Sequence, residues 1–78
     1  MVQSIISTVR TRINELDENI SSMVDYMNMK IQVEDWHAVA DAAMDIREFE
    51  AGMKELKTVL GSLELLKISE DMKNEKIT

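Results

Sequence analysis

The chain is short and acidic, with 78 residues, no cysteine, no proline, two glycines and a formal net charge of −6. The lack of cysteine excludes disulfides and thiolate zinc sites, and the single histidine excludes a multi-histidine site within one chain. The excess of acidic residues argues against binding to nucleic acid or to an anionic membrane surface. Because so short a chain buries only about 60% of its surface on folding, we expect a second subunit to complete the fold.

The first half of the chain carries apolar residues at alternating steps of four and three. This seam consists of Val2, Ile6, Val9, Ile13, Leu16, Ile20, Met23 and Met27. The spacing is a heptad pattern, which keeps one apolar stripe turned toward a neighbouring helix. It predicts a helix over about residues 3–30, with the cation of Lys30 near the negative C-terminal end.

The second half repeats this pattern and predicts a helix over about residues 35–67. Its seam consists of Val39, Ala42, Ile46, Phe49, Met53, Leu56, Leu60 and Leu63. Asp35 is suited to cap the start of this helix through its carboxylate, and we expect the helix to continue through Gly61. Beyond it, residues 68–78 are polar without a sustained apolar stripe, so we expect a frayed or disordered tail.

The two seams come into phase when the chain folds back near Val33. Met27 then lies level with Val39, and the matching continues layer by layer to Val2 with Leu63. The short connection is typical of antiparallel helix pairs. The sequence therefore predicts an all-α, antiparallel helical hairpin formed by residues 1–67.

Apolar residues outside the seams predict that two hairpins form a four-helix bundle homodimer with two-fold symmetry. One edge of the hairpin, here called the first flank, is apolar at its ends and small or polar in its middle. It consists of Ile5, Arg12, Asn19, Tyr26, Ala38, Asp45, Gly52, Val59 and Leu66. A two-fold axis at its centre brings Ile5 and Val59 toward Tyr26 and Ala38 of the partner subunit, and Arg12 toward the partner's Asp45. The opposite edge, the second flank, carries Arg10, Asp17, Glu50 and Lys57, whose charges suit solvent.

One row of side chains is a candidate metal site. His37, Asp41, Asp45 and Glu48 follow one another at helical spacing, and imidazole and carboxylate groups bind divalent cations. The competing interpretation, which we favour, is a solvated acidic face.

The basic residues Arg10, Arg12 and Lys57 are interpreted as salt-bridging surface. The sequence contains no phosphate loop, nucleophile arrangement or cofactor fingerprint, so no cofactor is expected.

The hairpin tip is a candidate patch for a protein partner. Tyr26, Met29, Ile31 and Trp36 lie around the expected connection, and Trp, Tyr and Met are enriched in the centres of protein interfaces. The alternative is that these side chains cap the core of the bundle.

The segment from Glu34 to Glu48, with its Asp-Trp-His opening and alanine-rich acidic continuation, resembles a stretch of small helical proteins from tailed bacteriophages and marine phage-like sequences. The resemblance covers about fifteen residues and implies a phage origin, without implying any site. The MazG-like all-α nucleotide pyrophosphatases are a second point of comparison. They hold magnesium through Glu-Glu-x-x-Glu and Glu-x-x-Asp motifs. Here Glu34, Asp35 and Asp41 are acidic, but Ala38 stands where both motifs need an acid.

The sequence thus predicts a small non-catalytic accessory or protein-binding protein that acts as a homodimer or higher oligomer. The alternative function is a minimal or degenerate metal-dependent nucleotide pyrophosphatase. The expected location is the cytoplasm, and for a phage-encoded protein the cytoplasm of its host.

Overall fold

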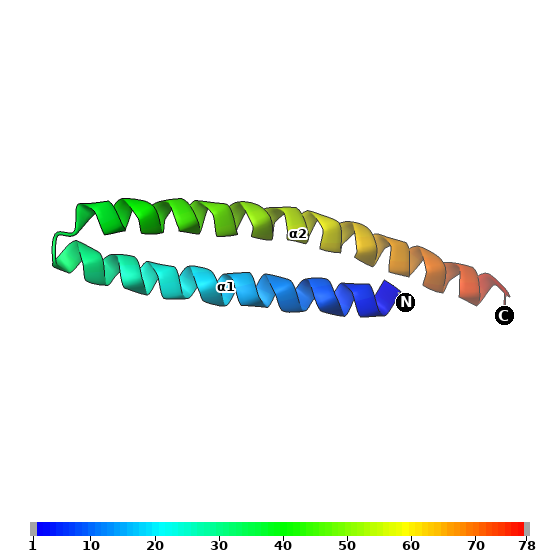
Figure 1. Ribbon diagram of the computed structural model, residues 1–78. Coiled ribbons are helices and arrows are strands. Elements are labelled where there is room, and N and C mark those ends of the chain that lie inside the picture. The colour runs from blue at the N-terminus through cyan, green and yellow to red at the C-terminus, as the bar shows by residue number, and fades with distance from the viewer. Residues whose placement is uncertain (1, 78) are drawn as a thin grey trace.

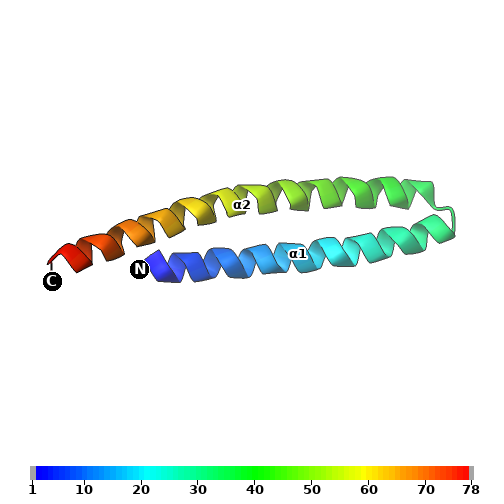
Figure 2. The same ribbon diagram turned by 180° about the vertical axis from the view of Figure 1, so that it is seen from behind.

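The protein is a pair of long antiparallel helices, as seen in a computed structural model (Figures 1 and 2). The structure describes the backbone of residues 2–77 and the side chains of residues 2–73. Helix α1 spans Val2–Gln32 and helix α2 spans Trp36–Ile77, and the described residues contain no strand. The molecule measures 65 × 14 × 14 Å. The predicted all-α hairpin is confirmed.

The core of the hairpin is a single layer of side chains between the helices. All sixteen seam residues are buried or half-buried, which confirms that the two heptad stripes face each other. Only four of the described hydrophobic side chains are buried rather than half-buried, namely Ile6, Leu16, Ala42 and Ile46. The core is thin because each helix has a neighbour on one side only.

The turn after α1 is closed by two backbone hydrogen bonds. The N–H of Glu34 donates to the carbonyl of Ile31, and the N–H of Asp35 donates to the carbonyl of Lys30, each over 3.0 Å. This pair of bonds is the Schellman arrangement, which requires a left-handed residue after the helix end. Glu34 supplies it with a φ of 58°. The Lys30 Nζ lies 4.0 Å from Asp35 Oδ2, which ties the two ends of the turn together.

Asp35 also begins α2, as predicted. Its Oδ1 accepts a hydrogen bond from the N–H of Ala38 over 3.2 Å, and its carbonyl accepts one from the N–H of Val39 over 3.1 Å. The side-chain bond satisfies the Ala38 N–H, which the first turn of a helix otherwise leaves without a partner, and the bond from Val39 is the first main-chain bond of α2. One residue therefore ends the turn and starts the second helix.

Helix α2 continues to Ile77, ten residues beyond the predicted end at Lys67, so the predicted end of the helix is wrong. The fraying expected over residues 68–78 stays a prediction. Thr78 lies outside the described residues. Glu, Lys, Met and Ile in this segment form helices readily, and neither proline nor a further glycine interrupts them. Helix α2 passes through Gly61 as predicted and projects past the start of α1 (Figures 1 and 2).

Candidate functional site

The first flank leaves large apolar side chains exposed at both of its ends. Ile5 is 44% exposed, Tyr26 40%, Val59 46% and Leu66 49%. Ile5, Val59 and Leu66 lie toward the open end of the hairpin, and Tyr26 lies near the tip, beside the half-buried Ala38. The heptad pattern had assigned all of these residues to one edge.

The tip end of the first flank is hollowed into an open groove of about 360 Å³. The groove is lined by Met23, Tyr26, Asp35, His37, Ala38, Asp41, Ala42 and Asp45. Its lining combines small or apolar side chains with three carboxylates and contains neither lysine nor arginine. Such a groove favours an apolar group that carries a cation beside it.

Gly52 lies at the middle of the first flank and is half-buried. Its φ is not positive, and a Cβ added to it would lie 4.0 Å from Leu16 Cδ1, which is ordinary van der Waals contact. The hairpin itself would therefore accept alanine here, although a glycine inside a helix costs about 1 kcal/mol relative to alanine. The missing side chain leaves room for a group from outside the hairpin.

The charged side chains of the first flank are not paired with each other within one hairpin. Arg12 Nη1 lies 3.1 Å from Glu15 Oε2, one turn along the same helix, and both side chains are more than half exposed. Asp45 has no ion-pair partner among the described residues of the chain. A pair as exposed as Arg12–Glu15 contributes little stability, so Arg12 can exchange its partner at low cost.

The second flank is held by a cross-helix ion pair. Arg10 Nη2 lies 2.9 Å from Glu64 Oε1, and Lys67 Nζ donates to Gln3 Oε1 nearby. The prediction of salt-bridging surface is confirmed for Arg10 and Arg12, whereas Lys57 forms no ion pair among the described residues. Farther along, an open groove of about 840 Å³ has side chains of both charges, among them Asp17, Arg47, Glu50, Lys54 and Lys57.

The candidate metal row does not come together as a cluster. His37 Nε2 lies 3.6 Å from Asp41 Oδ2, but His37 is 92% exposed and water competes for both groups. Asp45 lines the same groove, whereas Glu48 does not. Over the part of the chain that the structure describes, no three histidine or acidic side chains are placed to hold a metal ion.

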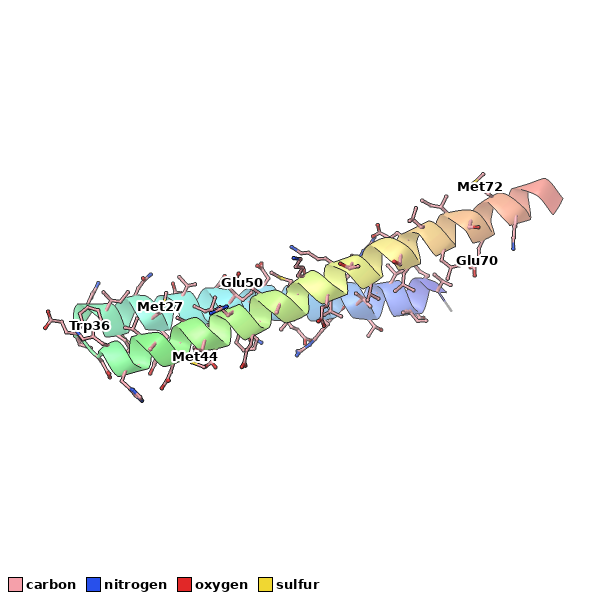
Figure 3. The ribbon with its side chains drawn as sticks, turned by 90° about the horizontal axis from the view of Figure 1, so that it is seen from above. Met27, Trp36, Met44, Glu50, Glu70 and Met72 are labelled. Carbon is pink, nitrogen blue, oxygen red and sulfur yellow. The ribbon has the colours of Figure 1, made fainter. Side chains whose placement is uncertain are left out.

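The tip patch is exposed in the hairpin. Met29 and Ile31 are exposed, and Trp36 is 61% exposed at the start of α2 (Figure 3). Lys30 Nζ lies 5.5 Å from the centre of the Tyr26 ring, a cation–π contact that orients Tyr26. These side chains contribute little to the core of a single hairpin.

An apolar stripe on the far end of α2 was not predicted from the sequence. Leu65, Ile68 and Met72 are all exposed, and Figure 3 shows Met72 on the part of α2 that lies beyond α1. Their spacing of three and four residues was the signal for a continued helix. It was hidden because the apolar positions leave the seam and move to the outer face.

Comparison with known protein families, curated proteins and solved structures finds no match to this chain. Neither α1 nor α2, within the described residues, has an apolar stretch long enough to cross a bilayer. The candidate function therefore rests on the surfaces of the hairpin itself.

Proposed function

We propose that this chain is a non-catalytic protein–protein interaction protein that works as a homodimer. Two hairpins pack through their first flanks and form an antiparallel four-helix bundle. The second flanks then remain free to contact other proteins. The phage resemblance of the segment from Glu34 to Glu48 fits a small accessory protein of this kind.

The observation that carries the proposal is the surface that a single hairpin leaves exposed. The hairpin has an accessible surface of 6065 Å². A compact monomer of 8.9 kDa exposes about 4,800 Å², so the excess is about 1,250 Å². A standard interface buries roughly 800 Å² on each partner. The excess surface of one hairpin is larger than this area. The radius of gyration is 18.5 Å, whereas a compact domain of this length has a radius of gyration of about 11.5 Å.

The first flank is complementary to itself in shape when the partner runs antiparallel. Its tip end is hollow, and its open end carries the projecting side chains of Ile5 and Val59. A two-fold axis at the level of Leu16 sets each open end against the hollow end of the partner subunit. Gly52 lies near that axis, where two helices approach most closely.

The first flank is complementary to itself in charge in the same arrangement. The axis brings Arg12 to the partner's Asp45, at the edge of a groove whose three carboxylates have no lysine or arginine among them. Opposite charges that meet across an interface select its register. A dimer in this register therefore satisfies both the unpaired Asp45 and the exposed Arg12.

The two glycines of α2 provide a matched test of the dimer. We expect the wild-type protein to be a dimer in sedimentation equilibrium. Gly52→Glu should weaken dimerisation by about a hundredfold, because it places an unpaired carboxylate at the centre of the interface. Gly61→Glu adds the same charge to the same helix at a position with nothing within 4 Å, and should leave the dimer intact. A monomeric wild-type protein would remove the proposal.

The non-catalytic part of the proposal has its own measurement. The wild-type dimer should not hydrolyse nucleoside triphosphates in the presence of magnesium or manganese. Should it do so, with the activity lost in Asp41→Ala, the chain would be an enzyme and the pyrophosphatase alternative would replace this proposal.

A further inference from the structure

We infer that the far end of α2 clasps the tip of the partner hairpin, with Leu66 of each chain against the partner's Val33. The inference rests on the proposed homodimer and gives a role to the end of α2 that the sequence analysis had read as a tail. The occupant of this surface is a second copy of the same chain.

Leu66 lies at the margin of its own hairpin, past the last pair of seam residues, and is about half exposed. Helix α1 begins at Val2, which the seam places level with Leu63, so Leu66 lies beyond the start of α1. It lies on the first flank, seven residues after Val59, and it is exposed. A leucine beyond the last layer of its own core packs fully only when another chain covers it.

Val33 occupies the corresponding place at the tip. It follows Tyr26 by seven residues and therefore continues the first flank into the connection between the helices. It is 66% exposed, the highest value among the large apolar residues near the tip. Its own hairpin covers it poorly because the chain reverses direction at this point.

The register of the dimer brings these two residues to one level. In that register Ile5 and Val59 face Tyr26 and Ala38 of the partner subunit. One heptad farther along α2 is a step of about 10 Å and leads from Val59 to Leu66. The same step along the partner's α1 leads from Tyr26 to Val33. The two steps run in the same direction, so each end of the bundle carries one such contact.

The charges near this contact are also complementary. Lys73 lies on the first flank one heptad after Leu66, on the part of α2 that projects past the partner's tip. The tip carries the exposed carboxylate of Glu34 and that of Asp35, whose Oδ2 lies 4.0 Å from Lys30 Nζ of the same chain. Attraction between the amine of Lys73 and these carboxylates favours the antiparallel clasp over a parallel dimer, in which the end of α2 would meet a second copy of itself.

Cysteine cross-linking tests the clasp directly, because the natural chain contains no cysteine. The double variant Val33→Cys/Leu66→Cys should form a disulfide-linked dimer when oxidised glutathione is added. Within one chain the two positions lie about 50 Å apart, so a disulfide can form only between chains. Val33→Cys/Leu65→Cys is the matched control, since Leu65 points to the outer face, and it should cross-link far more slowly.

The outcomes separate the clasp from the dimer itself. Covalent dimers of Leu66→Cys alone would indicate a parallel arrangement and would overturn the clasp. Equal cross-linking at positions 65 and 66 would overturn it as well, while sedimentation of the wild-type protein as a dimer would still support the proposed function. A monomeric wild-type protein would remove both.

Discussion

Glu34 holds the left-handed backbone conformation that the turn needs, with a φ of 58°. A side chain costs roughly 1–2 kcal/mol in this conformation, whereas glycine adopts it freely. We expect Glu34→Gly to raise the free energy of unfolding by about 1 kcal/mol in urea denaturation at a fixed protein concentration. Glu34→Ala removes the same charge but keeps a Cβ and should show no such gain. A lower stability of the glycine variant would contradict this account of the turn.

The sequence predicted the role of one of the two residues that make the turn. Asp35 was predicted as the cap because an acid stands directly before the second seam, and its bond to the Ala38 N–H confirms the prediction. The left-handed Glu34 was not foreseen, because glutamate has no preference for that conformation. Its backbone is determined by the closure of the two helices rather than by its side chain.

At the scale of the helices, periodicity predicted the hairpin but not the full length of α2. Sixteen in-phase positions are a long signal, and burial follows it at every position. After Leu63 the apolar residues no longer follow the seam. Because the prediction followed that one stripe, it ended the second helix at Lys67. The first flank was predicted to the same extent, because heptad positions determine which residues lie on that edge of the hairpin. The groove beside Ala38 and the Arg10–Glu64 pair depend on side-chain conformations that spacing does not determine.

Gly61 gives a prediction for α2 as an element. It lies inside the helix with nothing within 4 Å of an added Cβ, and its φ is not positive. Gly61→Ala should therefore raise the free energy of unfolding by about 1 kcal/mol, because alanine loses less backbone freedom in a helix. Circular dichroism during urea denaturation measures the change. An unchanged or lower stability would mean that α2 is interrupted at Gly61 in solution.

At the scale of the whole molecule, the proposed dimer would make folding depend on association, because the core of one hairpin is thin. One layer of side chains with four buried members is a small core for two helices of 31 and 42 residues. Helices gain most of their stability from packing of their apolar faces rather than from intrinsic propensity. The first flank and the tip would supply the missing packing, and the unfolding of a dimer would then release two chains.

This coupling predicts that the Tm of the wild-type protein rises with protein concentration. Each tenfold increase in concentration favours the folded dimer by about 1.4 kcal/mol, and the shift is measurable by circular dichroism over a wide concentration range. Gly52→Glu should have a lower Tm than the wild-type protein at each concentration, because its dimer is weaker by about a hundredfold, whereas Gly61→Glu should follow the wild-type protein. A wild-type Tm that stays constant would mean that one hairpin folds by itself, and the exposed first flank would then need another explanation than a second copy of this chain.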